Sequence, residues 1–186
     1  VSFNIDTSAI KRAITPKTKA IVPVHLFGLA ANMDEIMDIA NTHNLFVIED
    51  NAQGIGGVYT SKDGTKKKTG TIGHVASTSF FPSKNLGCYG DGGAIFTNDD
   101  DLAHTIRGIV NHGMYQRYHH DVVGVNSRLD SIQAAVLRAK LPKLDAYNQA
   151  RLEAAIKYNK AFSGIANLIT PSYGCENCFC DMKNCD

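Results

Sequence analysis

Two short apolar runs near the start of the chain flank a segment with helical periodicity. Residues 20–28 (AIVPVHLFG) and 45–50 (LFVIED) are rich in β-branched and aromatic side chains and are short enough to be buried strands. Between them, Asn32 is a typical N-cap residue with Glu35 three positions later. It precedes four apolar residues with helical spacing, Met33, Ile36, Met37 and Ala40. The pattern predicts a strand–helix–strand unit.

The alternation of strands and helices continues along the chain. Residues 74–81 and 93–98 have the composition of strands. Three aspartates follow Asn98, which indicates the start of a helix because anions are favoured at the positive end of the helix dipole.

The second half of the chain has weaker signals. A helix is expected from near Ser127, and Pro142 is expected to open or kink a helix that runs to about Phe162. Residues 61–70, rich in lysine, predict a hairpin or loop with solvated charges. Alternating strands and helices together predict an α/β fold, with a sheet covered by helices.

Composition excludes several classes of protein. The chain has 186 residues, 44% hydrophobic and 20% charged, with Lys+Arg 19 against Asp+Glu 18. This near-neutral balance gives no electrostatic case for binding nucleic acid. No apolar run approaches the roughly 18–20 residues that span a bilayer, and no signal peptide is recognisable, so we expect no membrane association and a cytoplasmic location.

The cysteines are unevenly distributed. Cys88 stands alone, whereas Cys175, Cys178, Cys180 and Cys185 crowd the C-terminal tail. Four thiolates can ligate zinc, but this spacing does not form two zinc knuckles, so we expect no metal site. Because the chain also begins at Val1 without an initiator methionine, we expect it to be part of a longer protein.

Two of the predicted strands end in polar residues. Asp50 closes one strand with Gln53 shortly after it, and Ser79 closes another, followed by a loop that contains Lys84. In α/β sheets, ligands bind beyond the carboxyl ends of the strands. A carboxylate, a hydroxyl and a lysine at neighbouring strand ends match the needs of pyridoxal phosphate, which requires a Schiff-base amine and a carboxylate for its ring nitrogen.

Simpler interpretations stay open for these residues. Asp50 alone could cap a helix, Lys84 alone could be a surface lysine, and the glycines at 54, 56 and 57 could form a plain turn. A dinucleotide fingerprint is incomplete, since no acidic residue ends a strand about 20 residues further on.

The sequence resembles the DegT/DnrJ/EryC1/StrS sugar aminotransferases. The resemblance runs from about Phe3 to Phe162 through the segments AITPKTKAIVPVHLFG, VIEDNAQ, GTIGHVASTSFFPSKNLGCYGDGGAIFTND, NHG and VGVNSRLDSIQAAVL. It implies the large domain of a three-layer, aspartate aminotransferase-like fold, with a mostly parallel sheet and helices on both faces. Residues 1–162 would be the central part of this domain with a linker helix, and residues 163–186 the start of a small domain or an aberrant tail.

The resemblance implies roles for five residues. Lys84 would form the Schiff base with pyridoxal phosphate and act as general base, and Asp50 would pair with the pyridine nitrogen. Gln53 would lie against the ring near its phenolic oxygen. Ser79 would hold the phosphate, and Asn126 would reach the phosphate of the partner subunit's cofactor.

Substrate contacts follow less directly from the resemblance. Arg128 is expected at the shared site near the sugar, and Arg117, in the segment RYHH (117–120), is expected to contribute across the interface unless that segment is a solvated loop. Guanidinium groups suit carboxylate and diphosphate. His25 either lines the site or is a satisfied core histidine.

The implied function is amination of a nucleotide-linked keto sugar. The motifs are most similar to enzymes that aminate UDP-3-oxo-N-acetylhexuronates for surface polysaccharide, with glutamate as the expected donor and a homodimer with shared sites. Alternatives are a sugar dehydratase, in which histidine replaces the lysine, a non-catalytic sugar-nucleotide-binding regulator, and a zinc-stabilised module. The phosphate clamp that precedes this region in the family, and its small domain, are absent from these 186 residues.

Overall fold

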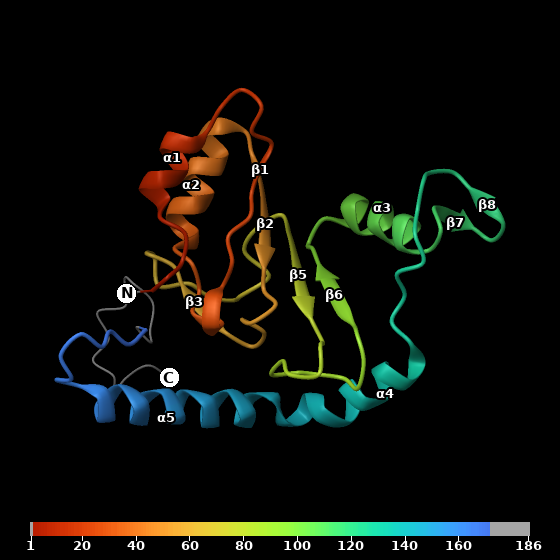
Figure 1. The fold of residues 1–186 in the computed structure, drawn as a ribbon. Coiled ribbons are helices and arrows are strands. Elements are labelled where there is room, and N and C mark those ends of the chain that lie inside the picture. The colour runs from red at the N-terminus through yellow and green to blue at the C-terminus, as the bar shows by residue number, and fades with distance from the viewer. Residues whose placement is uncertain (1, 172–186) are drawn as a thin grey trace.

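The computed structural model describes residues 2–171, which build an α/β fold around a four-stranded sheet (Figure 1). The strand order is β1-β2-β5-β6. β1, β2 and β5 run parallel and β6 pairs antiparallel with β5. The bounds are β1 Ala20–Ile21, β2 Phe46–Asp50, β5 Val75–Ser79 and β6 Gly93–Phe96. The predicted α/β class with a mostly parallel sheet is confirmed.

Helices and two hairpins complete the fold. The helices are α1 Thr7–Ala13, α2 Met33–His43, α3 Asp100–Val110, α4 Ser131–Lys140 and α5 Leu144–Phe162, with 3-10 turns η1 Leu26–Gly28 and η2 Leu141–Lys143. The hairpins pair β3 Val58–Thr60 with β4 Lys66–Lys68, and β7 Met114–Gln116 with β8 His119–His120. Within residues 2–171 no helix has both the length and the apolar character needed to cross a membrane.

The helix ends follow the signals in the sequence. The side chain of Asn32 accepts a hydrogen bond from the N–H of Glu35, and Asn44 ends α2 in the left-handed conformation with φ 52°. Asp99 caps α3 through the N–H of Leu102. Short polar side chains can satisfy the free N–H groups of a first helical turn, which is why these helices start where they do.

The two faces of the sheet differ in burial. Side chains alternate along a strand, so Val47 and Glu49 of β2 lie on the face that packs on α2, where both are buried. Asp50 lies on the opposite face. The core on the α2 side contains Ile10, Ile21, Ala31, Met33, Ile36, Ile39, Ala40, Leu45, Val47 and Tyr59.

A second core joins the loop after β5 to the C-terminal helices. It contains Phe80, Leu86, Cys88, Leu137 and Leu144. In Figure 1 the arrows of β2 and β5 point toward the long helix α5, which runs past that edge of the sheet. Burial of these apolar side chains therefore holds α4 and α5 beside the carboxyl ends of the strands.

Two predicted elements differ from the structure. The run 20–28 forms a shorter strand, because Pro23 has no N–H to donate to the ladder and the chain then enters η1. The helix expected from Ser127 begins at Ser131, because residues 126–127 pair as extended chain with Asn111 and Val110. Pro142 lies in η2, which opens α5 as expected.

Candidate active site at the carboxyl ends of β2 and β5

Asp50 and Ser79 lie on one face of the sheet at neighbouring strand ends. β2 and β5 are adjacent and parallel, with Asp50 in register with Ser77. Ser79 lies two residues beyond Ser77 and so points to the same face. The tertiary structure therefore brings together the two polar strand ends that the sequence indicated.

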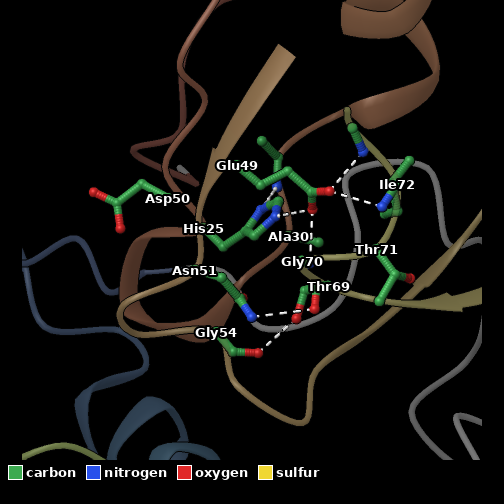
Figure 2. A network of polar contacts seen from close by, with 12 residues as sticks. His25, Ala30, Glu49, Asp50, Asn51, Gly54, Thr69, Gly70, Thr71 and Ile72 are labelled. Carbon is green, nitrogen blue, oxygen red and sulfur yellow. Dashed lines mark hydrogen bonds and ion pairs between the residues drawn. The ribbon is translucent and has the colours of Figure 1, made fainter. Parts of the chain in front are cut away.

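The Asp50 side chain is only partly used by its own loop. Its Oδ1 accepts a 3.0 Å hydrogen bond from the N–H of Ala52, in the turn that follows β2. Figure 2 shows the carboxylate pointing away from the buried side chains that surround Glu49. The second oxygen, Oδ2, has no hydrogen-bond partner among residues 2–171, so it can accept a bond from a ligand.

Lys84 lies in the turn directly after β5. Its N–H donates to the Phe81 carbonyl at 2.9 Å, and the Phe81 N–H donates to Ser79 Oγ at 3.2 Å. The hydroxyl proton of Ser79 is thus still available to donate. Lys84 is half-buried, and within the described chain its amine takes part in no hydrogen bond or ion pair.

Asn148 of α5 connects the loop after β2 with the loop after β5. Its Oδ1 accepts a 2.6 Å bond from Asn85 Nδ2, and its Nδ2 donates to the Ile55 carbonyl at 2.9 Å. Asn85 is the residue after Lys84, and Ile55 belongs to the turn that begins at Asp50. One amide side chain therefore fixes the two candidate loops relative to each other.

Gln53 stabilises the turn that follows β1. Its Oε1 accepts a 2.8 Å bond from the N–H of Phe27, a residue with φ 57°. Phe27 is in the left-handed region, which non-glycine residues rarely adopt, so this bond compensates part of the strain. The Gln53 amide can still donate through its NH₂ group.

Behind Asp50, on the other face of the sheet, lies a buried polar network (Figure 2). The Glu49 carboxylate accepts bonds from His25 Nε2 at 2.8 Å and from the N–H groups of Gly70, Ile72 and Gly73 at 2.7, 2.7 and 2.6 Å. The side chains of His25 and Glu49 are both 0% exposed.

The hydrogen bonds of this network define the charge state of its two members. The Ala31 N–H donates to His25 Nδ1, so the ring is neutral and its proton lies on Nε2, where it is donated to Glu49. Burial alone would raise the pKa of the Glu49 carboxyl. The bonds from His25 and the three backbone N–H groups outweigh burial and lower that pKa below its ordinary value.

This environment bears on the two alternatives for His25. Both ring nitrogens are bonded within the chain and the side chain has no exposed surface. The arrangement is that of a satisfied core histidine.

The turn after Asp50 is held by a second group of buried contacts. Asn51 Nδ2 donates to the Thr69 carbonyl at 3.1 Å, and Thr69 Oγ1 donates to the Gly54 carbonyl at 2.6 Å. A Cβ on Gly54 would lie 2.4 Å from Asn51 Oδ1, so this close approach requires glycine. Packing of this turn against Asn51 therefore accounts for the glycine at position 54.

The remaining predicted residues lie elsewhere. Arg117 is exposed in the β7–β8 hairpin, where it bonds and stacks on Tyr118, with 4.9 Å from its guanidinium carbon to the ring centroid. Arg128 Nε donates to Asn126 Oδ1 at 3.1 Å, and both line an open pocket of about 980 Å³ along β6 and α3. Asp50, Gln53, Ser79 and Lys84 do not line that pocket.

The donor set at the strand ends fits pyridoxal phosphate. The free carboxylate oxygen of Asp50 suits the ring nitrogen of that molecule, and the unpaired amine of Lys84 suits its aldehyde. The hydroxyl proton of Ser79 suits the phosphate, and the amide of Gln53 suits the phenolic oxygen. No group of three or more histidine, cysteine, aspartate or glutamate side chains within residues 2–171 could hold a metal ion. The cysteine-rich tail lies outside the described residues.

Comparison with known proteins decides the family. The profile of the DegT/DnrJ/EryC1/StrS aminotransferase family matches residues 1–176. The chain belongs to this family. It spans about two fifths of the length of the curated relatives it matches, with 39–43% of three of them covered.

Two curated relatives are named as sugar aminotransferases. The UDP-2-acetamido-2-deoxy-3-oxo-D-glucuronate aminotransferase of Pseudomonas aeruginosa is 54% identical over 80% of this chain and 39% of its own length. The UDP-N-acetyl-3-dehydro-alpha-D-glucosamine 3-aminotransferase of Acidithiobacillus ferrooxidans is 51% identical over 88% of this chain and 43% of its own. A relative from Geobacillus stearothermophilus, 51% identical over 86% of this chain and 42% of its own, is named a pleiotropic regulatory protein.

Solved structures have the same fold. Streptomyces venezuelae DesV, in complex with a ketimine intermediate, superposes with a TM-score of 0.81 at 44% identity, over 87% of this chain and 42% of that one. A Bacillus subtilis structure with bound cofactor PMP superposes with a TM-score of 0.76 at 36% identity, over 86% of this chain and 35% of that one. The aminotransferase-like fold is confirmed, and the comparisons support pyridoxal phosphate as the cofactor.

Sequence reasoning missed the residues that support the site. Glu49 was part of an apparently apolar run, and Asn85 and Asn148 belong to a loop and a helix with no motif of their own. A signal existed for Glu49, since a charged side chain at a buried position of a strand needs several hydrogen-bond donors. No signal in the sequence pairs Asn85 with Asn148.

Proposed function

We propose that this chain is part of a pyridoxal phosphate-dependent aminotransferase that acts on a nucleotide-linked keto sugar. The observation that supports this most is the pair formed by Asp50, with a free carboxylate oxygen, and Lys84, with an unpaired amine, at adjacent strand ends. The substrate we propose is a UDP-3-oxo-N-acetylhexuronate, used for surface polysaccharide, because a relative 54% identical is named for that type of sugar.

Each residue has a definite chemical task in this proposal. The bound cofactor supplies an electron sink that stabilises negative charge on the carbon next to the nitrogen. Asp50 keeps the ring nitrogen protonated, Ser79 donates to the phosphate, and Gln53 donates to the phenolic oxygen. Lys84 removes the proton from the α-carbon of the amino donor, for which we propose glutamate. It returns a proton at the sugar carbon that receives the amino group.

The assembly we propose is a homodimer with shared sites in the cytoplasm. Asn126, Arg128 and Arg117 belong to elements other than the loops of Asp50 and Lys84, and in Figure 1 the β7–β8 hairpin extends away from the carboxyl ends of β2 and β5. They would serve the site of the partner subunit, where guanidinium groups bind the diphosphate and the carboxylate of the sugar.

Two other functions have less support. A sugar dehydratase of this fold would have histidine at the position of Lys84. A regulator that binds sugar nucleotides without catalysis is suggested by the name of one relative, but such a protein does not need both Asp50 and Lys84.

Reduction of the complete protein with borohydride, followed by peptide mapping, tests the proposal. We expect a phosphopyridoxyl group on Lys84, and glutamate-dependent formation of 2-oxoglutarate with the UDP-3-oxo sugar. The matched control is Lys67→Ala, which removes an exposed lysine of the β3–β4 hairpin and should change neither result. A label on another lysine, or release of water from the sugar without an amino product, would refute it.

A further inference from the structure

Glu49 is a buried carboxylate that touches none of the proposed reactive groups. Its four hydrogen bonds come from His25 and from the backbone of the segment 70–73. These donors belong to the turn after β1 and to the segment that leads into β5. The Glu49 side chain therefore joins the turn after β1 to the segment before β5, one residue before the end of β2.

The backbone of Asp50 is fixed by the same neighbours. Its N–H donates to the Pro23 carbonyl at 2.8 Å, and its carbonyl accepts from the His25 N–H at 3.0 Å. The next N–H, that of Asn51, donates to the Ser77 carbonyl at 2.8 Å. His25 thus holds this strand end twice, through its backbone at Asp50 and through its ring at Glu49.

Consecutive strand residues point to opposite faces, so the orientation of one side chain limits that of the next. Figure 2 shows the Glu49 side chain entering the network and the Asp50 side chain leaving it on the other side of the strand. A twist of the strand that turned the Asp50 Cβ in another direction would also displace Glu49 from its four hydrogen bonds.

A role in stability alone does not explain this arrangement well. Taking a carboxylate out of water is costly, and an apolar side chain of similar size is often as good or better for stability. A fully bonded polar network, in contrast, has one arrangement only, so it specifies the direction of the chain that passes through it.

We propose that Glu49, held by His25 and the N–H groups of residues 70, 72 and 73, is a positioning residue that aims the Asp50 carboxylate at the ring nitrogen of the cofactor. The proposal rests on the proposed function, because it needs Asp50 to be the partner of that nitrogen.

The Glu49→Gln substitution in the complete protein tests the idea. A glutamine has the same shape, but in the carboxylate each oxygen accepts at least one backbone N–H. Whichever oxygen the NH₂ group replaces, it faces an N–H donor, so the network is broken. The readout is the nitrogen-15 chemical shift of pyridoxal phosphate labelled at its ring nitrogen, which reports protonation without any turnover. The reference is Asp50→Asn, which removes the carboxylate itself.

We expect the Glu49→Gln signal to move most of the way from the wild-type position to that of Asp50→Asn. We also expect kcat to fall by about tenfold or more while KM for the sugar changes little, since the loss affects the reacting ring rather than sugar binding. Glu35→Gln is the matched control. It removes a carboxylate of α2 that accepts a 2.6 Å bond from Thr7 of α1, and should leave the signal in place.

A Glu49→Gln protein that folds and binds cofactor with the wild-type signal would overturn the positioning role, even if its melting temperature were lower. If that variant fails to fold, His25→Gln decides by the same criterion, because it keeps the buried carboxylate and changes only one of its donors. If Asp50→Asn also leaves the signal unmoved, the proposed function of Asp50 fails instead, so the two failures are distinguishable.

Discussion

Asn148 accepts a 2.6 Å hydrogen bond from Asn85, the residue that follows Lys84, while it donates to the carbonyl of Ile55 at 2.9 Å. The two loops that end β2 and β5 are therefore connected through a residue of α5. This contact gives the C-terminal helix a role in the site that its own sequence does not indicate.

Removal of this connection should loosen the site without unfolding the protein. We expect Asn148→Ala to weaken cofactor binding by about tenfold, since two hydrogen bonds of about 1 kcal/mol each are lost and part of that loss falls on the bound state. Cofactor titration by fluorescence measures it. Gln149→Ala is the control, because Gln149 bonds only to Glu153 within α5 among the described contacts. Equal effects of the two variants would contradict the role of Asn148.

Lys84→Ala should abolish transamination in the complete protein. None of the lysines in the β3–β4 hairpin can replace its amine, because they belong to another loop. Single-turnover assays with glutamate measure the loss. Substantial turnover in this variant would assign the proton transfer to a different group.

Asp50→Asn should separate cofactor binding from catalysis. The substitution keeps the shape and the bond from the Ala52 N–H, but it removes the charge that holds the ring nitrogen protonated. We therefore expect bound cofactor with turnover lowered by several orders of magnitude, at about 1.4 kcal/mol of barrier for each tenfold. Near-normal turnover would remove Asp50 from the mechanism.

Shared sites predict complementation between inactive subunits. A Lys84→Ala subunit mixed with an Asn126→Ala, Arg128→Ala subunit forms heterodimers in which one of two sites is intact. With free exchange, half of the dimers are mixed, so about a quarter of wild-type activity is expected. Subunit exchange is verified by mass spectrometry. Exchange without recovered activity would mean that each site is built within one chain.

The charge of Glu49 predicts a pH-dependent stability. Because its pKa is lowered in the folded state, the carboxylate stabilises the fold above the ordinary glutamate pKa of about 4.3, and this contribution is lost as pH falls through the lower folded value. We expect the difference in melting temperature between wild type and Glu49→Gln to be largest near neutral pH and to shrink below about pH 4. A difference that stays constant over this range would show that the carboxylate is not ionised in the fold.

Local signals in the sequence determined much of the architecture. Apolar runs located β2, β5 and β6, and Asn32 with the helical spacing after it located the start of α2. These features depend on neighbours in the chain, through side-chain alternation and capping, so a sequence pattern suffices to find them. The family motifs likewise pointed to Asp50 and Lys84 as the residues of interest.

Tertiary structure alone decided which residues support Asp50 and Lys84. The pairing of Asn85 with Asn148 joins positions 63 apart in the chain, and Glu49 meets Gly73 across 24. Such contacts depend on how helices and loops pack after the sheet has formed, and no periodicity encodes them. The same applies to His25, whose chemistry allowed either a ligand contact or a core position. Its burial and its two hydrogen bonds, set by the packing of three segments around one carboxylate, place it in the core.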